Sequence, residues 1–239
     1  MCEIKCVDCK TACFINQNCT TEWMNKIELK KNQIDHRAKD CIFREDGYIE
    51  GIYFIQQGNV KIVSKGAAKK EQIVRLATDG HVLGHRGNGD DKYPISAIAL
   101  TDTVVCFIDN NTLNEVFINN PNVAIGLMMF YSRELRKSEI RLKYLMQMNV
   151  RERIAEALLL NKEVFGMDEK NKSLNVPFSR QEYADMTGTR VEQVGRELAK
   201  FEDEKLIIRN SQSQIKLIDI SGLKQIIKKY GTEQYTEQG

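Results

Sequence analysis

The chain has 239 residues, of which 42% are hydrophobic and 28% are charged, and its formal net charge is +2. This composition is typical of a globular protein with room for two modest domains, and it excludes a disordered or fibrous chain. No run of about 18 apolar residues and no secretory signal occurs, so we expect a cytoplasmic protein without a membrane span.

Cysteines are concentrated at the N-terminus. Five of the seven fall within the first nineteen residues, at Cys2, Cys6, Cys9, Cys13 and Cys19. An odd number of cysteines in a chain of this size argues against an extracellular disulfide framework. We therefore expect residues 1–19 to carry reduced thiols, with metal or redox chemistry as the more specific hypothesis.

Residues 20–120 are predicted to begin with a short helix and to continue as an antiparallel β-roll. The helical stretch TTEWMNKIELKKNQI leads to an extended segment around Cys41–Phe43. The stretch IYFIQQGNVKIV alternates apolar and polar residues on both sides of Gln57-Gly58, which indicates a strand, a turn and a strand. The later stretches EQIVRLA and YPISAIALTDTVVCFID predict further short strands, and closely spaced glycines suit the turns between them.

A long helix is predicted over 121–149, because the apolar residues there recur at steps of three and four. They form a narrow seam flanked by charged residues, which is typical of a parallel coiled coil between two copies of the chain. The alternative is a helix that packs on its own domain, but such a helix usually has a broader apolar stripe. The residues expected to pair across the dimer are Met128, Tyr131, Leu135, Leu142 and Leu145, with Ser138 and Asn149 also on the seam.

The C-terminal third is predicted to form a helix followed by a winged helix-turn-helix. After the helical stretch VRERIAEALLLNKEVFG, Ser179 is a natural N-cap, and Glu182 three residues later completes a capping box. Gly188 lies where the tight turn to a second helix, from about Arg190 to Glu204, requires left-handed backbone. LIIRNSQSQIKLIDI then predicts two strands around a polar turn, which form the wing.

Net charge does not predict DNA binding, because residues 151–239 carry 15 basic and 15 acidic side chains. The local arrangement does predict it, since the start of the second helix of such a motif reaches base edges in the major groove. Arginine can donate to guanine and glutamate can accept from cytosine. Alternatives are a capping box from Thr189 to Glu192 and a solvated Arg196. The candidate DNA contacts are Ser179, Arg180, Arg190, Glu192, Gln193, Gly195 and Arg196.

This order of elements resembles the Crp/Fnr superfamily of bacterial transcription regulators from about Thr20 to Leu223. The family's recognition pattern E-x-x-[S/G]-R matches Glu192-Gln193-Val194-Gly195-Arg196. The resemblance implies an α+β fold with a cyclic-nucleotide-binding-like jelly roll, a long dimerisation helix and a winged helix-turn-helix. The expected divisions are a Cys-rich segment (1–19), a β-roll sensor domain (20–120), a dimerisation helix (121–149), a DNA-binding domain (150–225) and a C-terminal tail (226–239).

The resemblance also implies a function. A homodimer would bind an inverted-repeat site on double-stranded DNA and act with RNA polymerase. No nucleophile–base pair or pair of acids occurs in a recognisable frame, so an enzyme is not expected. The alternative is a β-roll that serves as a protein-interaction or metal-binding module, with a vestigial DNA-binding domain.

The β-roll departs from the cyclic-nucleotide branch at the phosphate anchor. That branch has G-E-[L/I] and R-[S/T]-A, where this chain has Gly80-His81-Val82 and Ile95-Ser96-Ala97. Without the arginine, a buried cyclic phosphate lacks its charge-assisted contact, so cyclic AMP is not an expected ligand. His81 and His85 are four residues apart but lack a matching third ligand, so a metal between them is not expected.

The oxygen-sensing branch of the superfamily holds a [4Fe–4S] cluster with C-x2-C-x5-C and a distant fourth cysteine. Cys6 and Cys9 match the first pair and Cys106 the distant position, whereas Cys13 comes too early and Cys19 too late for the third. The resemblance implies redox, oxygen or nitric oxide sensing at these residues. Zinc also accepts four cysteines, and reversible thiol oxidation or, for Cys106, an inert buried thiol are the further interpretations. The candidate ligands are Cys6, Cys9, Cys13, Cys19 and Cys106.

Overall fold

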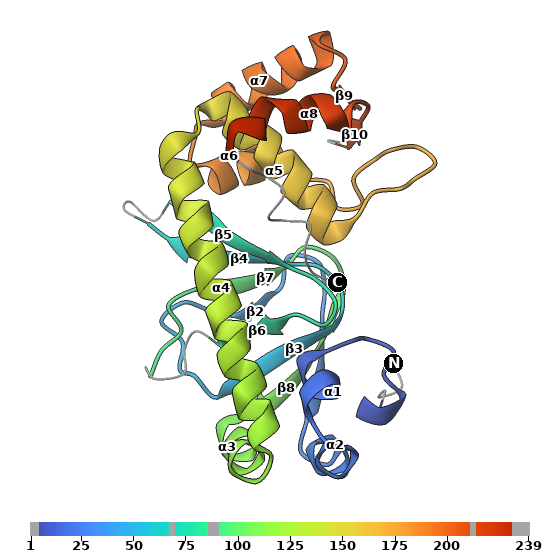
Figure 1. The fold of residues 1–239 in the computed structure, drawn as a ribbon, viewed down its shortest axis with the longest axis vertical. Coiled ribbons are helices and arrows are strands. Elements are labelled where there is room, and N and C mark those ends of the chain that lie inside the picture. Colours follow the sequence, from blue (N-terminus) through green and yellow to red (C-terminus); the bar gives the residue numbers. More distant parts are fainter. Residues whose placement is uncertain (1–4, 67–69, 86–90, 211–213, 231–239) are drawn as a thin grey trace. The chain divides into compact units, whose positions relative to one another are not determined.

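The fold was analysed in a computed structural model that describes residues 5–66, 70–85, 91–210 and 214–230 (Figure 1). The chain divides into two compact units, Met1–Lys137 and Ser138–Gly239. The first unit contains the β-roll, and the second contains the helix-turn-helix. Within the described ranges, no helix is long and apolar enough to cross a membrane.

The β-roll consists of two four-stranded antiparallel sheets, in the orders β1-β8-β3-β6 and β2-β7-β4-β5. The antiparallel β-roll predicted from the sequence is thereby confirmed. Strands β3 and β4 flank Gly58 but do not pair with each other, because each belongs to a different sheet. At this corner Gly58 has φ +123°, and a Cβ there would lie 2.4 Å from the Thr103 Oγ1. The strands are β1 (Asn32–His36), β2 (Cys41–Phe43), β3 (Gly51–Gln57), β4 (Val60–Lys65), β5 (Glu71–Ala77), β6 (Val82–Leu83), β7 (Ser96–Ala99) and β8 (Thr103–Asp109).

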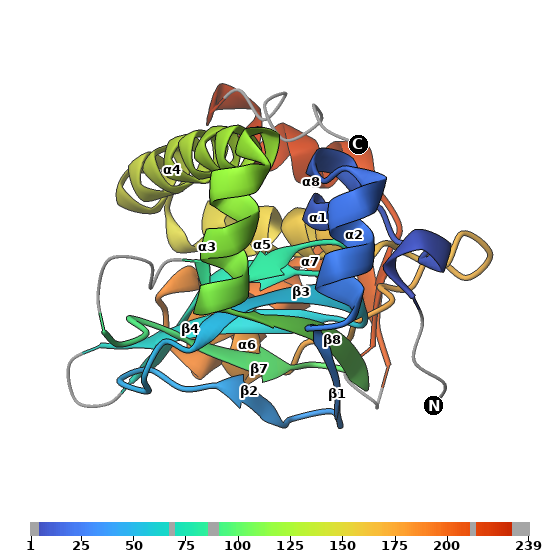
Figure 2. The same cartoon turned by 90° about the horizontal axis from the view of Figure 1, so that it is seen from below.

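Strand β3 is buried on both faces, which explains its nearly continuous apolar sequence. Ile55 contributes to a core between the two sheets. Ile52 and Phe54 contribute to a second core, which the sheet shares with helices α1 (Phe14–Asn18), α2 (Thr21–Glu28) and α3 (Asn110–Asn119) on its outer face (Figure 2).

Residues 13–19 of the Cys-rich segment contribute to this second core. Phe14 and Ile15 of α1 are buried in it, together with Ile27 of α2. The predicted helix that continues to Ile34 is wrong at its end, because α2 stops at Glu28. Residues from Asn32 onward instead pair with β8 as strand β1.

Two further helical features differ from the prediction. Helix α3 was not predicted; Asp109 caps it by accepting a hydrogen bond from the Thr112 N–H at 3.0 Å. The long helix α4 (Pro121–Gln147) begins as predicted but ends before Asn149. Asn149 is not a seam residue, because it forms the capping box of the next helix, α5 (Val150–Phe165), with Glu152.

The second unit has a helix-turn-helix and a two-stranded wing, as predicted. The elements after α5 are α6 (Arg180–Thr187), α7 (Val191–Asp203), β9 (Ile207–Arg209), β10 (Ile215–Leu217), α8 (Ile220–Ile227) and the short η4 (Lys228–Tyr230). The expectation of a tail from residue 226 is wrong at its start, because Ile227 is buried in this unit. Residues 231–239 lie outside the described ranges.

Candidate nucleic-acid interface and cysteine pocket

Helix α6 is held at its start by the predicted capping box. The Glu182 N–H donates to the Ser179 Oγ at 3.2 Å, and the Ser179 N–H donates to the Glu182 Oε2 at 2.9 Å. The helix ends at Gly188, whose φ of +63° is the left-handed value that the tight turn requires. These local interactions fix where α7 begins.

Helix α7 has one buried face and one exposed face. Val194, Leu198 and Phe201 are buried. The capping box from Thr189 to Glu192 is not formed, because Arg190 is the N-cap and the Thr189 hydroxyl donates instead to Gln193. Ser179, Arg180, Arg190, Glu192, Gln193 and Arg196 are all exposed, and Gly195 is half-buried.

The exposed face of α7 has room for a partner. A Cβ at Gly195 would meet nothing closer than the Arg180 Nη1 at 3.8 Å, so packing within the chain does not require glycine there. No ion pair joins Glu192 and Arg196, although they are one turn apart. Their charged groups can therefore bind another molecule without losing an intramolecular partner.

An ion pair that sequence analysis did not identify fastens the wing to α7. The Arg209 Nε donates to the Glu202 Oε2 at 2.7 Å, and the Arg209 N–H donates to the Glu202 Oε1 at 2.8 Å. The Arg209 guanidinium lowers the pKa of Glu202 through these bonds. Strands β9 and β10 form the predicted antiparallel hairpin, with its turn residues 211–213 outside the described ranges.

Large apolar side chains are exposed along α4. Met128, Leu135 and Leu142 of the predicted seam are each more than 60% exposed. Tyr131 and Leu145 are half-buried, and the Tyr131 hydroxyl donates to the His85 carbonyl at 2.5 Å. Other exposed apolar residues of the helix are Ile125, Met129 and Met146.

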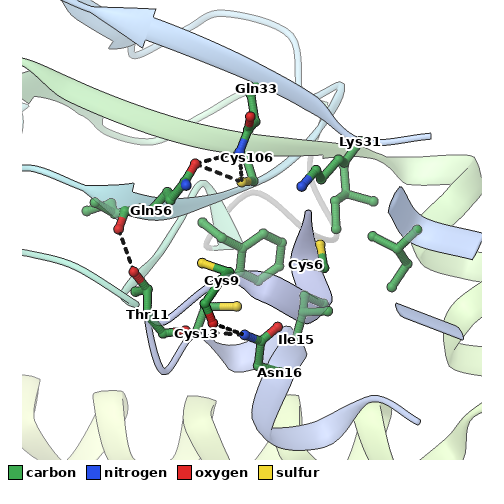
Figure 3. Close-up of a pocket in the computed structure, with 14 residues that line it drawn as sticks. Cys6, Cys9, Thr11, Cys13, Ile15, Asn16, Lys31, Gln33, Gln56 and Cys106 are labelled. Atoms are coloured by element: carbon green, nitrogen blue, oxygen red, sulfur yellow. Dashed lines mark hydrogen bonds between the residues drawn. The ribbon is translucent and has the colours of Figure 1, made fainter. Parts of the chain in front are cut away.

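Four of the candidate cysteine ligands line one pocket (Figure 3). Cys6 and Cys9 come from a short 3-10 helix and its C-cap, Cys13 is the N-cap of α1, and Cys106 is on β8. Cys19 does not line this pocket, and its Sγ accepts a hydrogen bond from the Asn120 side chain at 3.5 Å. Cys2 lies outside the described residues.

Hydrogen bonds hold the cysteine segment against the β-roll. The Thr11 hydroxyl donates to the Gln56 carbonyl at 2.8 Å, and the Cys6 N–H donates to the Glu28 Oε2 at 2.6 Å. Gly80 permits this close approach, because a Cβ there would lie 2.8 Å from the Ala12 carbonyl oxygen, and its φ is +80°. Gly80 thus supports the N-terminal segment, a role that its sequence motif did not indicate.

Both apolar and polar side chains line the pocket. Ile27, Phe54 and Ile108 line it together with the cysteines. Gln33 lies opposite Cys106 in the β1–β8 ladder, and its side chain donates to the Gln56 Oε1 at 2.6 Å. Sequence analysis did not identify Gln33, Gln56 or the neighbouring Lys31, because only the strand pairing brings them to the cysteines.

Burial affects the protonation of the pocket thiols. It raises the pKa of Cys6 to about 12, although the nearby Lys31 ammonium opposes the rise. Burial also raises the pKa of Cys13 and Cys106. These thiols are therefore protonated at neutral pH, and any ligand role would require the loss of their protons.

The donor set fits a thiolate-ligated group. Four cysteines are the ligands that structural zinc and iron–sulfur clusters take. Among the residues that the structure describes, however, no three His, Cys, Asp or Glu side chains are already arranged around a single metal position. The pocket gathers the donors, and ligation requires their sulfurs to move closer together.

The positions of the cyclic-nucleotide anchor have other roles in this chain. Ile95 is buried in the core between the sheets, and the Ser96 Oγ accepts a hydrogen bond from the Glu45 N–H at 2.9 Å. Burial, assisted by the charge of Arg75, lowers the pKa of His81 to about 4, so its imidazole is neutral at physiological pH. His85 is buried against the rings of Phe130 and Tyr131.

Comparison with known proteins agrees with this architecture. A family model described as "Cyclic nucleotide-binding domain" matches residues 33–120, and one described as "Crp-like helix-turn-helix domain" matches residues 152–226. The transcriptional regulatory protein Btr of Bordetella pertussis is 26% identical over 91% of this chain and 92% of its own. The activator Anr of Pseudomonas aeruginosa is 28% identical over 84% of each chain.

Solved structures show the same fold. FixK2 from Bradyrhizobium japonicum is 23% identical and aligns with a TM-score of 0.72 over 82% of this chain and 96% of its own. A regulator of the Crp/Fnr family from Eubacterium rectale aligns with a TM-score of 0.74 at 15% identity, over 90% of this chain and 97% of its own.

A β-roll followed by a helix-turn-helix is the domain arrangement of a DNA-binding transcription regulator, and the relatives are named as transcriptional regulators. The chain belongs to the Crp/Fnr family of transcription regulators.

Proposed function

We propose that the protein is a homodimeric regulator that binds an inverted-repeat DNA site and senses redox state through its cysteine pocket. The observation that carries the sensing function is the convergence of Cys6, Cys9, Cys13 and Cys106 on one pocket. Relatives named "Anaerobic regulatory protein" and "Fumarate and nitrate reduction regulatory protein" support the same class of signal. The alternative of a vestigial DNA-binding domain has no such support, because the capping box and left-handed turn of the motif are intact.

DNA recognition is assigned to the exposed face of α7. Glu192 and Arg196 would read base edges, with Gly195 allowing the helix to approach the groove closely. Ser179 and Arg180 at the start of α6, with Arg190 and Gln193, would contact the DNA backbone or flanking bases. Two such helices in a dimer would enter successive major grooves about 34 Å apart. Bound to such a site, the protein would act with RNA polymerase.

Dimerisation is assigned to the exposed apolar residues of α4. Leucine and methionine side chains at this exposure are unfavourable in water when they form a continuous row. A second copy of the same helix would cover Met128, Leu135 and Leu142 in a parallel coiled coil. Tyr131 and Leu145, which are half-buried in the single chain, would lie at the edge of this interface.

The sensing site would be formed by Cys6, Cys9, Cys13 and Cys106. When bound, a metal ion or iron–sulfur cluster held by four thiolates supplies metal–sulfur bonds that oxidants can break. The residues of this chain contribute the donors, an apolar wall that limits water, and the contacts of α1 with the rest of the unit. Cys19 and Cys41 lie outside the pocket, so we do not expect them to be needed.

The experiment combines metal analysis with DNA binding. The full-length protein is purified without oxygen, and iron, sulfide and zinc are measured per chain together with the visible spectrum. Serine variants of Cys6, Cys9, Cys13 and Cys106 should each lose the bound group, whereas Cys41→Ser, the matched control, should retain it. DNA affinity is then measured on an inverted-repeat site at several salt concentrations. A protein without salt-sensitive DNA binding to any sequence contradicts the proposal.

A further inference from the structure

A buried lysine lies beside the cysteine pocket. The side chain of Lys31, between α2 and β1, is only 2% exposed. A lysine in this environment loses the hydration of its charge, so it requires compensating partners. The Lys31 Nζ lies 2.9 Å from the Glu28 Oε2, which provides one such partner.

This ion pair is connected directly to the cysteine segment. The same Glu28 Oε2 that binds Lys31 also accepts the Cys6 N–H at 2.6 Å. Figure 3 shows the Lys31 ammonium directed toward the side of the pocket that holds the sulfurs of Cys6 and Cys106. Among the described residues that line the pocket, Lys31 is the one with a charged side chain.

The location is unexpected for a purely structural ion pair. A buried pair is often no more stabilising than apolar residues of similar size, and the neighbouring wall of the pocket is already apolar at Ile27 and Ile108. A positive charge beside the cysteines would, however, stabilise the negative charge that forms when their thiols become thiolate ligands. Four thiols that bind a zinc ion release four protons to solvent, and the resulting tetrathiolate centre has a net charge of two minus.

We propose that Lys31 is a positioning residue of the sensing site, whose buried ammonium compensates the negative charge of the ligated Cys6 and Cys106 thiolates. Glu28 holds this ammonium in place and fixes the backbone of Cys6 at the same time. Removal of the positive charge should weaken binding of any thiolate-ligated group, because the negative charges of the centre and of Glu28 would then lie together without a cation beside them. The inference rests on the proposed sensing function.

The test measures metal affinity rather than DNA binding. Reduced, metal-free full-length protein is titrated with Zn²⁺ in competition with a chelator. In a second arm it is reconstituted without oxygen with ferrous iron, ferric iron and sulfide, and cluster formation is followed by visible absorption. Lys31→Met removes the charge and keeps the length, whereas Lys31→Arg keeps the charge. Lys26→Met is the matched control, because Lys26 is an exposed residue of α2 that pairs with Glu22.

We expect Lys31→Met to bind zinc or the cluster about 10- to 100-fold more weakly, as for loss of other groups that surround metal ligands. Lys31→Arg should recover most of the affinity, and Lys26→Met should match the wild type. Thermal unfolding of the metal-free variants establishes that they are folded. If Lys31→Met does not fold, Lys31→Gln, which keeps a polar end, should show the same loss.

Equal affinities for Lys31→Met and Lys26→Met would overturn the role of Lys31 while leaving the proposed function intact. A wild-type protein that binds neither zinc nor a cluster would overturn both. The two failures are thereby distinguished by the wild-type titration alone.

Discussion

Phe14, the residue after Cys13, packs edge-on against Phe130 of helix α4, with ring centroids 6.4 Å apart. Phe14 also stacks on Phe54 of β3, which lines the cysteine pocket. On the next turn of α4, Gly126 lies against Asn18, where a Cβ would approach the Asn18 Oδ1 to 2.2 Å. Helix α1 thus connects the cysteines with the helix to which we assign dimerisation.

Replacing Phe14 by leucine should weaken this connection without emptying the core. We expect the free energy of unfolding to fall by about 1 kcal/mol, since an aromatic contact is lost and the apolar volume is nearly kept. Metal content should be retained, whereas the change of DNA affinity on metal removal should become smaller. Phe43→Leu is the control, because Phe43 stacks on Tyr53 and Tyr93 in the other core. If both variants respond to metal as the wild type does, α1 is not the connection.

Arg196→Ala should reduce DNA affinity by about 1–3 kcal/mol per half-site and relax the preference at one base pair. The reason is that an exposed arginine at this point of α7 can donate two hydrogen bonds to a guanine. Fluorescence anisotropy against a set of sites with single substitutions measures both effects. A loss that is equal on every sequence would instead identify Arg196 as a phosphate contact.

Leu142→Asp should convert the protein to monomers, because it places a charge in the apolar row of α4. Sedimentation equilibrium measures the mass, and inverted-repeat binding should be lost together with the dimer. Arg133→Asp is the control, since Arg133 is nine residues away, about half a turn around the helix, and is also exposed. A dimer that survives Leu142→Asp is inconsistent with this interface.

Stability should fall as the pH is lowered from 7.5 to 5. The pKa of His81 is about 4 in the folded protein and near 6.5 in the unfolded chain, so the unfolded chain binds the proton more readily in this window. The contribution of His81 is full above pH 6.5 and is lost as the pH falls toward 4, which predicts a loss of about 2 kcal/mol at pH 5. Urea unfolding at the two pH values measures it. In His81→Asn the pH dependence should decrease by this amount; an unchanged dependence would show that other groups cause it.

Structural features that depend on residues close together in the sequence could be predicted from the sequence. The capping box of Ser179 and Glu182 and the left-handed Gly188 follow from side-chain and backbone rules that act within ten residues. Helix α3 was missed because its main signal, the Asp109 cap, comes directly at the end of strand β8. The assignment of β3 and β4 to separate sheets also depends on strand pairing rather than on the turn between them.

The cysteine site likewise combines features that local spacing predicts with features that depend on long-range packing. Spacing identified Cys6, Cys9 and Cys106, whereas Cys13 comes too early and Cys19 too late for the remaining position. Burial of Phe14 and Ile15 orients α1 so that Cys13 lines the pocket and Cys19 contacts Asn120. That choice, like the presence of Lys31, arises from packing between residues far apart in the chain.

The most direct test of the account is metal and sulfide analysis of the protein purified without oxygen, before and after exposure to air. We predict a thiolate-bound iron–sulfur or zinc centre that requires Cys6, Cys9, Cys13 and Cys106, that air removes, and whose removal changes the affinity for inverted-repeat DNA. A protein that contains no iron, sulfide or zinc, and whose DNA affinity is the same before and after air, would contradict the sensing function.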